Sequence, residues 1–457
     1  MTAVLSSVFF FVIALGVLIT VHEFGHFWVA RKLGVKVLRF SVGFGKPLWS
    51  RRGKDGTEYV IAAIPLGGYV KMLDEREAPV APHELSFAFN RKPLGSRFAI
   101  VFAGPLFNFL LAILAYWAVF VIGVGGIKPI VDEVAPHSIA QKDGFQPGDV
   151  IVAVNGKQTA TWEGVMFALL DKALDRQTVE VRVKDVGQRE VTRTLDLSTI
   201  TGGDLDQGNL LSSIGIRPRR PLIPPVIGHL EVEGAAKRAG LAAGDRIIAA
   251  DGQPIKDWEE WVKYVQPRAE KVIRLDIERQ GQRLVLELRP VAVAAKEGTV
   301  GRIGAAVKIP EGELSEELRA VLRYSPGEAM MRAVEKTWDM SLLTLRMLAK
   351  MVTGVLSVSN LSGPISIAQY AGYSASAGLV SFLGFLAIVS ISLGVLNLLP
   401  IPILDGGHLM YYLIEWIKGS PVSEEAQALG QRVGIAVLGT LMIFAFYNDL
   451  ARLFGSP

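Results

Sequence analysis

Four long runs of apolar residues, none containing a charged side chain, divide the sequence. They cover residues 2–21, 98–127, 374–404 and 433–448. A helix needs about 20 mostly apolar residues to cross a bilayer, and the first three runs meet that length directly. The fourth is long enough if its helix begins near Gln427 and Arg432 extends toward the membrane surface. The pattern therefore predicts four transmembrane helices, over residues 1–30, 98–124, 376–404 and 427–447.

The basic residues predict how these helices are oriented. Residues 31–97 contain thirteen Lys and Arg residues, and cytoplasmic loops are enriched in these residues. We therefore expect this loop in the cytoplasm, with both termini and the long segment 128–373 on the outer side. The first and third spans then both end at the cytoplasmic side, so polar motifs at those two ends reach the same depth.

One segment outside the spans is duplicated. Residues 140–164 align with residues 236–260 at a constant offset of 96. Each copy has a Gly-Asp pair before a strand-like segment and an Asn-Gly or Asp-Gly turn after it. The copies resemble PDZ domains, over residues 127–220 and 222–310. That resemblance implies that each copy binds an extended peptide or a chain terminus, which adds a strand to the edge of a sheet. The alternative is a domain that binds no peptide and acts only as a spacer or a plug.

Two further segments have patterns of their own. Residues 36–75 contain two strand-like, unusually apolar stretches around the basic turn SRRGKDGT. Because β backbone is allowed at membrane depth only where protein or a cavity covers it, we expect a re-entrant, membrane-associated β-sheet here. The alternative is a plain cytosolic hairpin. Residues 316–372 have helical periodicity with charges at intervals, which predicts an amphipathic helical linker near the outer membrane surface.

The composition supports a membrane protein and argues against one class of partner. Half of the 457 residues are hydrophobic, and the net charge is only +4. The basic cytoplasmic loop explains this charge, so we expect the lipid bilayer as a partner and no nucleic acid. The predicted fold class is a mainly α-helical membrane protein with four transmembrane helices and a membrane-associated β-sheet, plus two α+β PDZ domains outside the membrane.

The polar block HEFGH, residues 22–26, lies inside the first span. On a helix His22 and His26 share one face, so both imidazoles can bind one Zn²⁺. Glu23 is then beside the metal, in place to accept a proton from water. The alternative is a pair of histidines that only hydrogen-bond between helices, which would leave a Glu and two His unsatisfied in apolar surroundings.

A third ligand is expected near the end of another span. Catalytic zinc sites have three protein ligands and one open position. Asp405 is the preferred candidate, because it ends the third uncharged run at the depth of the two histidines. His408 is the rival candidate, although a histidine near the end of a span is more often a helix-pairing residue.

Taken together, these motifs resemble the site-2 protease family of intramembrane zinc metalloproteases. The resemblance rests on HEFGH in the first span, AGPLFN (103–108) in the second, NLLPIPILDGGH (397–408) in the third and the tandem PDZ copies. It implies a zinc metalloendopeptidase in which His22, His26 and Asp405 bind the metal and Glu23 is the catalytic base.

The resemblance also implies regulated intramembrane proteolysis in the bacterial inner membrane. The expected substrates are single-span membrane proteins, such as anti-sigma factors, and signal-peptide remnants. Both termini and the PDZ domains are then periplasmic, and the active site lies toward the cytoplasm.

A transmembrane substrate must unwind before attack, and its freed backbone groups need partners. The substrate-binding residues we expect are Asn397, Pro400, Gly67, Gly68 and Tyr69. Asn108, in the second span, is interpreted instead as a helix-packing residue.

Two other functions fit parts of the sequence. A membrane-anchored zinc protease of the gluzincin kind would cut exposed loops and use a downstream Glu as its third ligand. No Glu lies in a comparable span. An inactive PDZ scaffold is expected to have lost Glu23 or a ligand, and the sequence keeps all of them.

Overall fold

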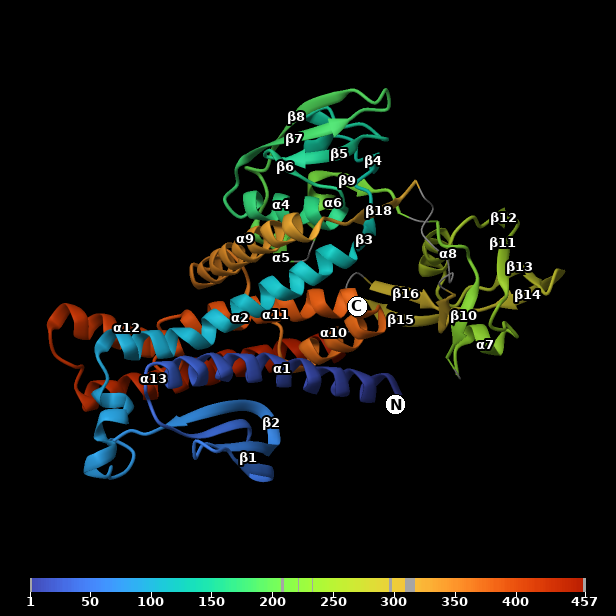
Figure 1. The fold of residues 1–457 in the computed structure, drawn as a ribbon. Helices are drawn as coiled ribbons and strands as arrows, with labels where there is room; N and C mark the ends of the chain where they lie inside the picture. The colour runs from blue at the N-terminus through green and yellow to red at the C-terminus, as the bar shows by residue number, and fades with distance from the viewer. Residues whose placement is uncertain are drawn as a thin grey trace.

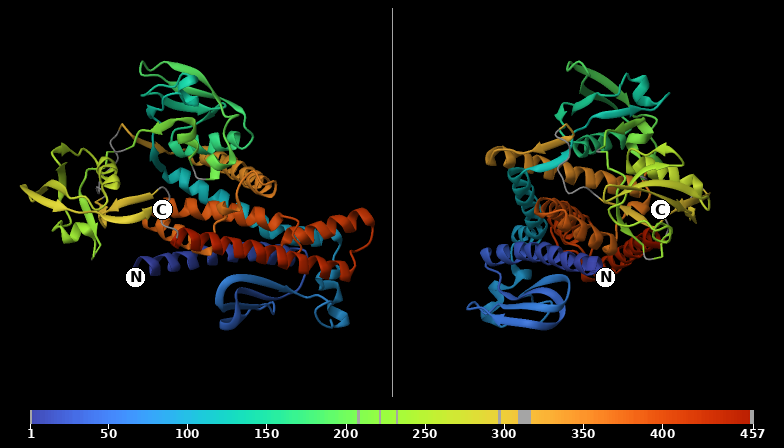
Figure 2. Two further views of the ribbon diagram at one scale, coloured as in Figure 1. Left: turned by 180° about the vertical axis from the view of Figure 1, so that it is seen from behind. Right: turned by 90° about the vertical axis from the view of Figure 1, so that its right-hand side faces the viewer.

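The structure is a computed structural model that describes residues 2–206, 209–220, 222–231, 233–295, 298–308 and 317–454. Its long helices lie side by side, and both chain ends are found at one end of this helical bundle (Figure 1). A small sheet packs beside the first helix, and two β-containing lobes project from the bundle. The first lobe and the small sheet lie on opposite sides of the helices (Figure 2).

Four helices in the described part of the chain are long and apolar enough to cross a membrane. They are α1 (Thr2–Lys32), α2 (Leu94–Ile122), α11 (Leu379–Leu398) and α13 (Glu424–Phe454). Each coincides with one of the four predicted spans, which supports an integral membrane protein. Helix α2 contacts α1, α11 and α12 (Asp405–Lys418), so it lies at the centre of the helical bundle.

The third span differs from its prediction at its C-terminal end. The apolar run continues to Leu404, but α11 ends at Leu398. Pro400 and Pro402 lack the backbone N–H that a continued helix needs, so the chain leaves the helix at this point. Residues 399–404 form an irregular connection, and α12 begins at Asp405. The expected span 376–404 is thus a 20-residue helix followed by a turn.

The sheet beside α1 is built from two long, bent strands, β1 (Val37–Arg52) and β2 (Glu58–Met72). Val42 pairs with both Gly68 and Ile61, so the bent strands place three of their segments next to one another. Strands are therefore found in the region 36–75 where a sheet was predicted. The segment 67–72 pairs with β1 along one side, and α1 packs against β2.

The two lobes repeat one arrangement of strands. The first contains β3 (Val124–Ile127), β4 (Val131–Val134), α3 (Ile139–Lys142), β5 (Val150–Val154), β6 (Lys157–Gln158), α4 (Trp162–Ala173), β7 (Thr178–Lys184), β8 (Glu190–Asp196), α5 (Gly202–Asp206), α6 (Leu210–Ile214) and β9 (Ile216–Pro218). The second contains β10 (Ile227–Leu230), α7 (Ala235–Arg238), β11 (Arg246–Ala250), β12 (Gln253–Pro254), α8 (Trp258–Val265), β13 (Ile273–Arg279), β14 (Gln282–Leu288), β15 (Val291–Ala295), β16 (Gly298–Arg302) and β17 (Ala305–Val307). Their main sheets have the equivalent orders β6-β5-β7-β8 and β12-β11-β13-β14.

The repeated Gly-Asp pair has the same structural role in both lobes. Asp149 and Asp245 are fully buried, where an unpaired carboxylate would be strongly unfavourable. Asp149 lies 3.0 Å from Arg193, and Asp245 lies 2.7 Å from Arg279. Each carboxylate also accepts a hydrogen bond from a backbone N–H three residues earlier. The Gly-Asp pair therefore closes the turn that leads into β5 or β11.

The segment after the second lobe connects the lobes to the helical bundle. It contains β18 (Arg319–Leu322), α9 (Pro326–Val352) and α10 (Pro364–Ser376). Residue 316, the first of the predicted linker, lies outside the described residues. Helix α9 packs on α2 and holds the first lobe through the pairs Arg346–Asp171 (2.5 Å) and Lys350–Asp175 (3.2 Å). Short 3₁₀ helices complete the described elements: η1 (Pro82–Phe87), η2 (Phe89–Arg91), η3 (Gln266–Arg268) and η4 (Val358–Asn360).

Candidate metal centre

The two histidines of HEFGH point in one direction from α1. Their ring centroids are 4.9 Å apart, and their Nε2 atoms are separated by 3.3 Å. Both side chains are nearly buried, with exposed fractions of 10% for His22 and 12% for His26. The four-residue spacing places the rings one above the other on the helix, as the sequence predicted.

Asp405 reaches the histidines from the far end of the chain. Its Oδ2 is 3.1 Å from His22 Nε2, and its Oδ1 is 3.5 Å from His26 Nε2. Donor atoms of the three residues lie within 4.8 Å of one another. The structure thus brings together the three side chains that the sequence analysis selected as ligands, although they come from helices almost 380 residues apart.

The turn before α12 explains how Asp405 gets there. The chain leaves α11 at Leu398 and folds closely around the first turn of α12. A Cβ atom on Gly406 would lie only 2.2 Å from the carbonyl oxygen of Leu399. Any larger residue would push the turn and α12 apart, which explains the glycine that follows Asp405.

The spacing of the donor atoms fits a zinc ion. Zinc binds imidazole nitrogen and carboxylate oxygen at about 2.0–2.2 Å, so neighbouring ligand atoms in a tetrahedral site are separated by about 3.4 Å. The two Nε2 atoms are 3.3 Å apart, and each lies 3.1 or 3.5 Å from a different oxygen of Asp405, distances near this value. Two histidines and one carboxylate also match the three-ligand composition of catalytic zinc sites, which keep one position for water or substrate.

A cavity of about 240 Å³ opens beside these donors. Its lining includes two candidate metal ligands, the candidate base, two residues of the sheet and two residues of α11. The lining residues are Ile19, His22, Glu23, Gly67, Gly68, Leu393, Asn397, Ile403, Leu404 and Asp405. Gly68 packs so closely on α1 that an added Cβ would be 3.0 Å from Glu23 Cγ. The cavity therefore combines two of the three donors, Glu23 and three of the predicted substrate-binding residues.

The remaining predicted residues lie elsewhere. The Tyr69 hydroxyl accepts a hydrogen bond from Arg39 (3.1 Å), and its ring stacks on Phe44. Pro400 lies in the turn after α11, where it ends the helix. His408 is exposed, lies edge-on to Tyr411 and is not part of the described donor cluster. These three residues do not belong to the described lining of the cavity.

Two residues of α2 next to the histidines were not identified as site residues from the sequence. A Cβ on Gly104 would be 2.3 Å from His26 Nε2 and 2.8 Å from His22 Nε2. Asn108 Nδ2 is 2.9 Å from His22 Nδ1, whereas the sequence analysis interpreted Asn108 as a packing residue. The signal was present in the AGPLFN segment, whose Gly and Asn are four residues apart on one helix face.

Helix α12 is fixed at its other end by an ion pair with α2. Arg97 Nη2 is 2.6 Å from Glu415 Oε1, and the exposed fractions of these side chains are only 15% and 16%. Arg97 also lies over the ring of Tyr412, 5.0 Å from its centroid. Because α12 begins with Asp405, this contact helps to set the position of the carboxylate.

Glu415→Ala is expected to lower the free energy of unfolding by about 2–3 kcal/mol, between the values for exposed and buried ion pairs, because Arg97 loses its partner. Chemical denaturation in detergent measures this change. Glu335→Ala is the matched control, since the Arg332–Glu335 pair is about half exposed, and we expect a change below about 1 kcal/mol. Equal effects of the two substitutions would contradict a special role for the Arg97–Glu415 pair.

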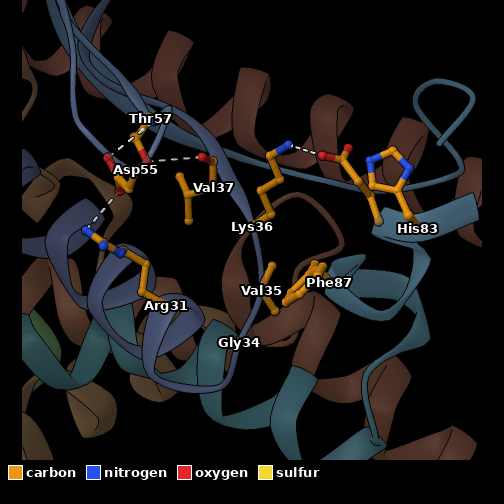
Figure 3. Close-up of a pocket in the computed structure, with 10 residues that line it drawn as sticks. Arg31, Gly34, Val35, Lys36, Val37, Asp55, Thr57, His83 and Phe87 are labelled. Atoms are coloured by element: carbon orange, nitrogen blue, oxygen red, sulfur yellow. Dashed lines mark hydrogen bonds and ion pairs between the residues drawn. The ribbon is translucent and has the colours of Figure 1, made fainter. Parts of the chain in front are cut away.

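A larger cavity, of about 380 Å³, lies where α1 ends and β1 begins (Figure 3). Its cations are already neutralised: Arg31 pairs with Asp55 at 3.0 Å, and Lys36 pairs with Glu84. Thr57 donates a hydrogen bond to the Val37 carbonyl across the same cavity. These contacts connect the sheet to α1, whereas His22 and Asp405 of the donor cluster line the other cavity.

Known proteins are similar to this chain over nearly its whole length. The sequence model of peptidase family M50 matches residues 10–441. The chain is 49% identical over 454 residues to the regulator of sigma E protease of Salmonella typhi, covering 99% of this chain and 100% of that protein. It is 49% identical over 445 residues to the regulator of sigma-E protease RseP of Escherichia coli, covering 97% and 98%. It is 45% identical over 458 residues to protease RseP of Yersinia pestis, covering 99% and 100%.

Proposed function

Since the chain belongs to peptidase family M50, the site-2 type of zinc metalloproteases, we propose that His22, His26 and Asp405 bind its zinc and that Glu23 is the catalytic base. The observation that carries this assignment is the cluster of three donors within 4.8 Å of one another. Glu23 lines the same cavity as two members of this cluster, His22 and Asp405. His408 is the less suitable third ligand, because its ring lies outside the cluster.

The reaction is hydrolysis of a peptide bond. Bound zinc supplies Lewis acidity, which polarises the scissile carbonyl and makes water nucleophilic at neutral pH. The Glu23 carboxylate accepts a proton from the attacking water and then delivers it to the leaving amide nitrogen. Ile19 and Leu393 line the same cavity and limit the access of bulk water to the reacting groups.

The substrate is a transmembrane segment whose helix unwinds locally in the cavity. Its freed N–H and C=O groups require protein partners, because lipid offers none. The edge segment 67–72 of the sheet supplies them through its backbone at Gly67 and Gly68, next to Glu23. Asn397 supplies a side-chain amide from the opposite wall. Because this role places the sheet at membrane depth, the β1–β2 sheet is a membrane-associated element.

The names of the similar proteins support a substrate class. Two of them are named regulators of sigma-E protease, which supports a single-span anti-sigma factor as the substrate of this chain, and signal-peptide remnants as further substrates. The chain then acts in regulated intramembrane proteolysis in the bacterial inner membrane.

The two lobes have the role of PDZ domains in the periplasm. Strands β9 and β17 pair with β4 and β10 in small two-stranded sheets, to which an extended peptide or chain terminus adds a further strand. Binding there selects substrates whose outer domains have already been shortened. This role is tested by titrating peptides with free termini into the full-length protein and recording NMR chemical shifts. Unchanged shifts in both lobes would favour lobes that bind no peptide and act only as spacers or plugs.

In the proposed orientation, both termini and the lobes lie in the periplasm, and the donor cluster lies toward the cytoplasm. The chain has no cysteine, so single-cysteine variants at exposed positions report their side directly. Membrane-impermeant maleimide added to intact spheroplasts is expected to label Lys142→Cys in the first lobe. It is expected to label Lys54→Cys and Ser420→Cys only after the membrane is opened. The reverse pattern would contradict this topology.

The proposed function is tested with purified protein and a single-span substrate reconstituted in one bilayer. We expect a zinc chelator to stop cleavage, added zinc to restore it, and mass spectrometry to place the cut inside the substrate's membrane segment. A cut only in exposed loops would instead indicate a membrane-anchored protease of the gluzincin kind. Absence of any cleavage by zinc-loaded protein would favour an inactive scaffold.

A further inference from the structure

The two ring nitrogens of His22 have different surroundings. Its Nε2 lies in the donor cluster, 3.1 Å from Asp405 Oδ2. Its Nδ1, on the opposite side of the ring, is 2.9 Å from Nδ2 of Asn108. Asn108 is fully buried, so water cannot replace either partner of this contact. The side-chain amide of Asn108 therefore determines which nitrogen of His22 carries a proton.

Metal binding through Nε2 requires an acceptor at Nδ1. A neutral imidazole that offers the Nε2 lone pair carries its proton on Nδ1. The partner of that proton must be the Oδ1 atom of Asn108, because Nδ2 only donates. The oxygen and nitrogen of a side-chain amide exchange places by a half-turn, and their assignment follows from the hydrogen-bond network. A half-turn of Asn108 places Oδ1 where Nδ2 contacts Nδ1.

Among the residues that the structure describes, the buried Oδ1 atom of Asn108 lacks a hydrogen-bond donor. A buried acceptor that is left unsatisfied is unfavourable. After the half-turn the oxygen accepts the Nδ1–H of His22, while Nδ2 takes the place that the oxygen leaves. What the arrangement gains is a proton on Nδ1, which leaves the Nε2 lone pair of His22 available to the metal.

His26 shows the same arrangement with a fixed partner. Its Nδ1 is 2.8 Å from the backbone carbonyl oxygen of Ile100. A carbonyl oxygen only accepts, so His26 Nδ1 must donate, and the Nε2 lone pair of His26 is free for the metal. Ile100 and Asn108 are eight residues apart on the same face of α2, with Gly104 between them. One face of α2 thus supports both imidazole rings.

We propose that Asn108 is a positioning residue of the metal centre, whose side-chain oxygen accepts the Nδ1–H of His22 and directs the Nε2 lone pair toward zinc. The inference rests on the proposed zinc-binding role of His22. The packing role of this region is carried separately by Ser390, whose hydroxyl donates to the backbone carbonyl of Asn108 at 2.7 Å and connects α11 to α2.

The experiment measures the zinc affinity of purified full-length protein in detergent, by competition with a chromogenic chelator. Outer partners of metal-binding histidines typically change affinity by about 10–100-fold, and we expect a loss of this size for Asn108→Ala and Asn108→Leu. Asn108→Asp keeps an acceptor oxygen and should remain within about threefold of the wild type. Ser390→Ala is the packing control: its unfolding temperature falls, while its zinc affinity stays at the wild-type value.

The outcomes separate this inference from the proposed function. Wild-type affinity in Asn108→Ala would overturn the positioning role, as would an Asn108→Asp protein that binds as weakly as Asn108→Ala. If Asn108→Leu does not fold, the alanine and aspartate variants still decide. His22→Ala tests the ligand assignment itself: zinc retained in that variant would contradict the proposed metal centre, whatever Asn108 does.

Discussion

Glu23→Gln is expected to reduce cleavage of a single-span substrate by about 10²–10⁴-fold, the usual contribution of a general base. Glutamine keeps the size of the side chain beside Gly68 but cannot accept the proton of the attacking water. The proposed zinc ligands His22, His26 and Asp405 are untouched, so zinc content should stay near that of the wild-type protein. Single-turnover cleavage in a reconstituted bilayer, together with metal analysis of the same sample, measures both quantities.

The matched control is Glu77→Gln, at a carboxylate that is 57% exposed and lies 3.5 Å from Lys71. This change removes the same charge outside the cavity, and we expect wild-type cleavage. Near-normal cleavage by Glu23→Gln would remove Glu23 from the mechanism. Loss of zinc together with activity would indicate that Glu23 acts on the metal centre and not on the proton.

Gly104→Ala is expected to weaken zinc binding by at least about 100-fold, the upper end of what an outer partner of the ligands contributes. The added methyl group would be 2.3 Å from Nε2 of His26 and 2.8 Å from Nε2 of His22. These are the two atoms that face Asp405, so at least one ring must move away from the metal position. Chelator competition on the purified protein measures the change.

Gly16→Ala on α1 controls for the effect of alanine in a helix. Apart from its chain neighbours and the nearby backbone of α1, no atom of the described residues lies within 4 Å of the position of its Cβ. We expect wild-type zinc affinity and unchanged or higher stability, because alanine favours a helix by about 0.5–1 kcal/mol over glycine. Equal losses of zinc in both variants would show that the effect of Gly104→Ala does not come from contact with the histidines.

The helices and the donor set could be predicted because they depend on strong local patterns. Uncharged runs of membrane length predicted the positions of α1, α2, α11 and α13. The i, i+4 spacing of His22 and His26 follows directly from helix geometry. Asp405 could be selected as the third ligand because the basic loop 31–97 predicts that the first and third spans end at the same depth. The 96-residue repeat likewise led to two sheets with equivalent strand order.

The arginine partners of the buried aspartates and the pairing of β1 with β2 depend on contacts between distant segments, which the spacing of residues in the sequence does not show. Arg193 and Arg279 have equivalent roles beside Asp149 and Asp245, yet they come from β8 and β13, so the repeat does not align them. The bent strands β1 and β2 pair twice because of their bends, and a pattern of apolar residues does not specify that register.

The support of the histidines by α2 was missed for a similar reason. Gly104 and Asn108 have the same appearance in the sequence as ordinary helix-packing residues. Only the approach of α2 to α1 shows that their face contacts imidazole nitrogens. The apolar run alone extends the third span to residue 404, whereas Pro400 and Pro402 in the same run already mark the helix break that the structure shows after Leu398.

Zinc content of purified Asp405→Asn and His408→Ala tests the proposed metal centre most directly. Asparagine keeps the size of Asp405 but lacks the negative charge that binds zinc. We predict zinc well below one ion per chain for Asp405→Asn, and the wild-type content for His408→Ala. Wild-type zinc in Asp405→Asn, together with loss of zinc in His408→Ala, would contradict the ligand set His22, His26 and Asp405.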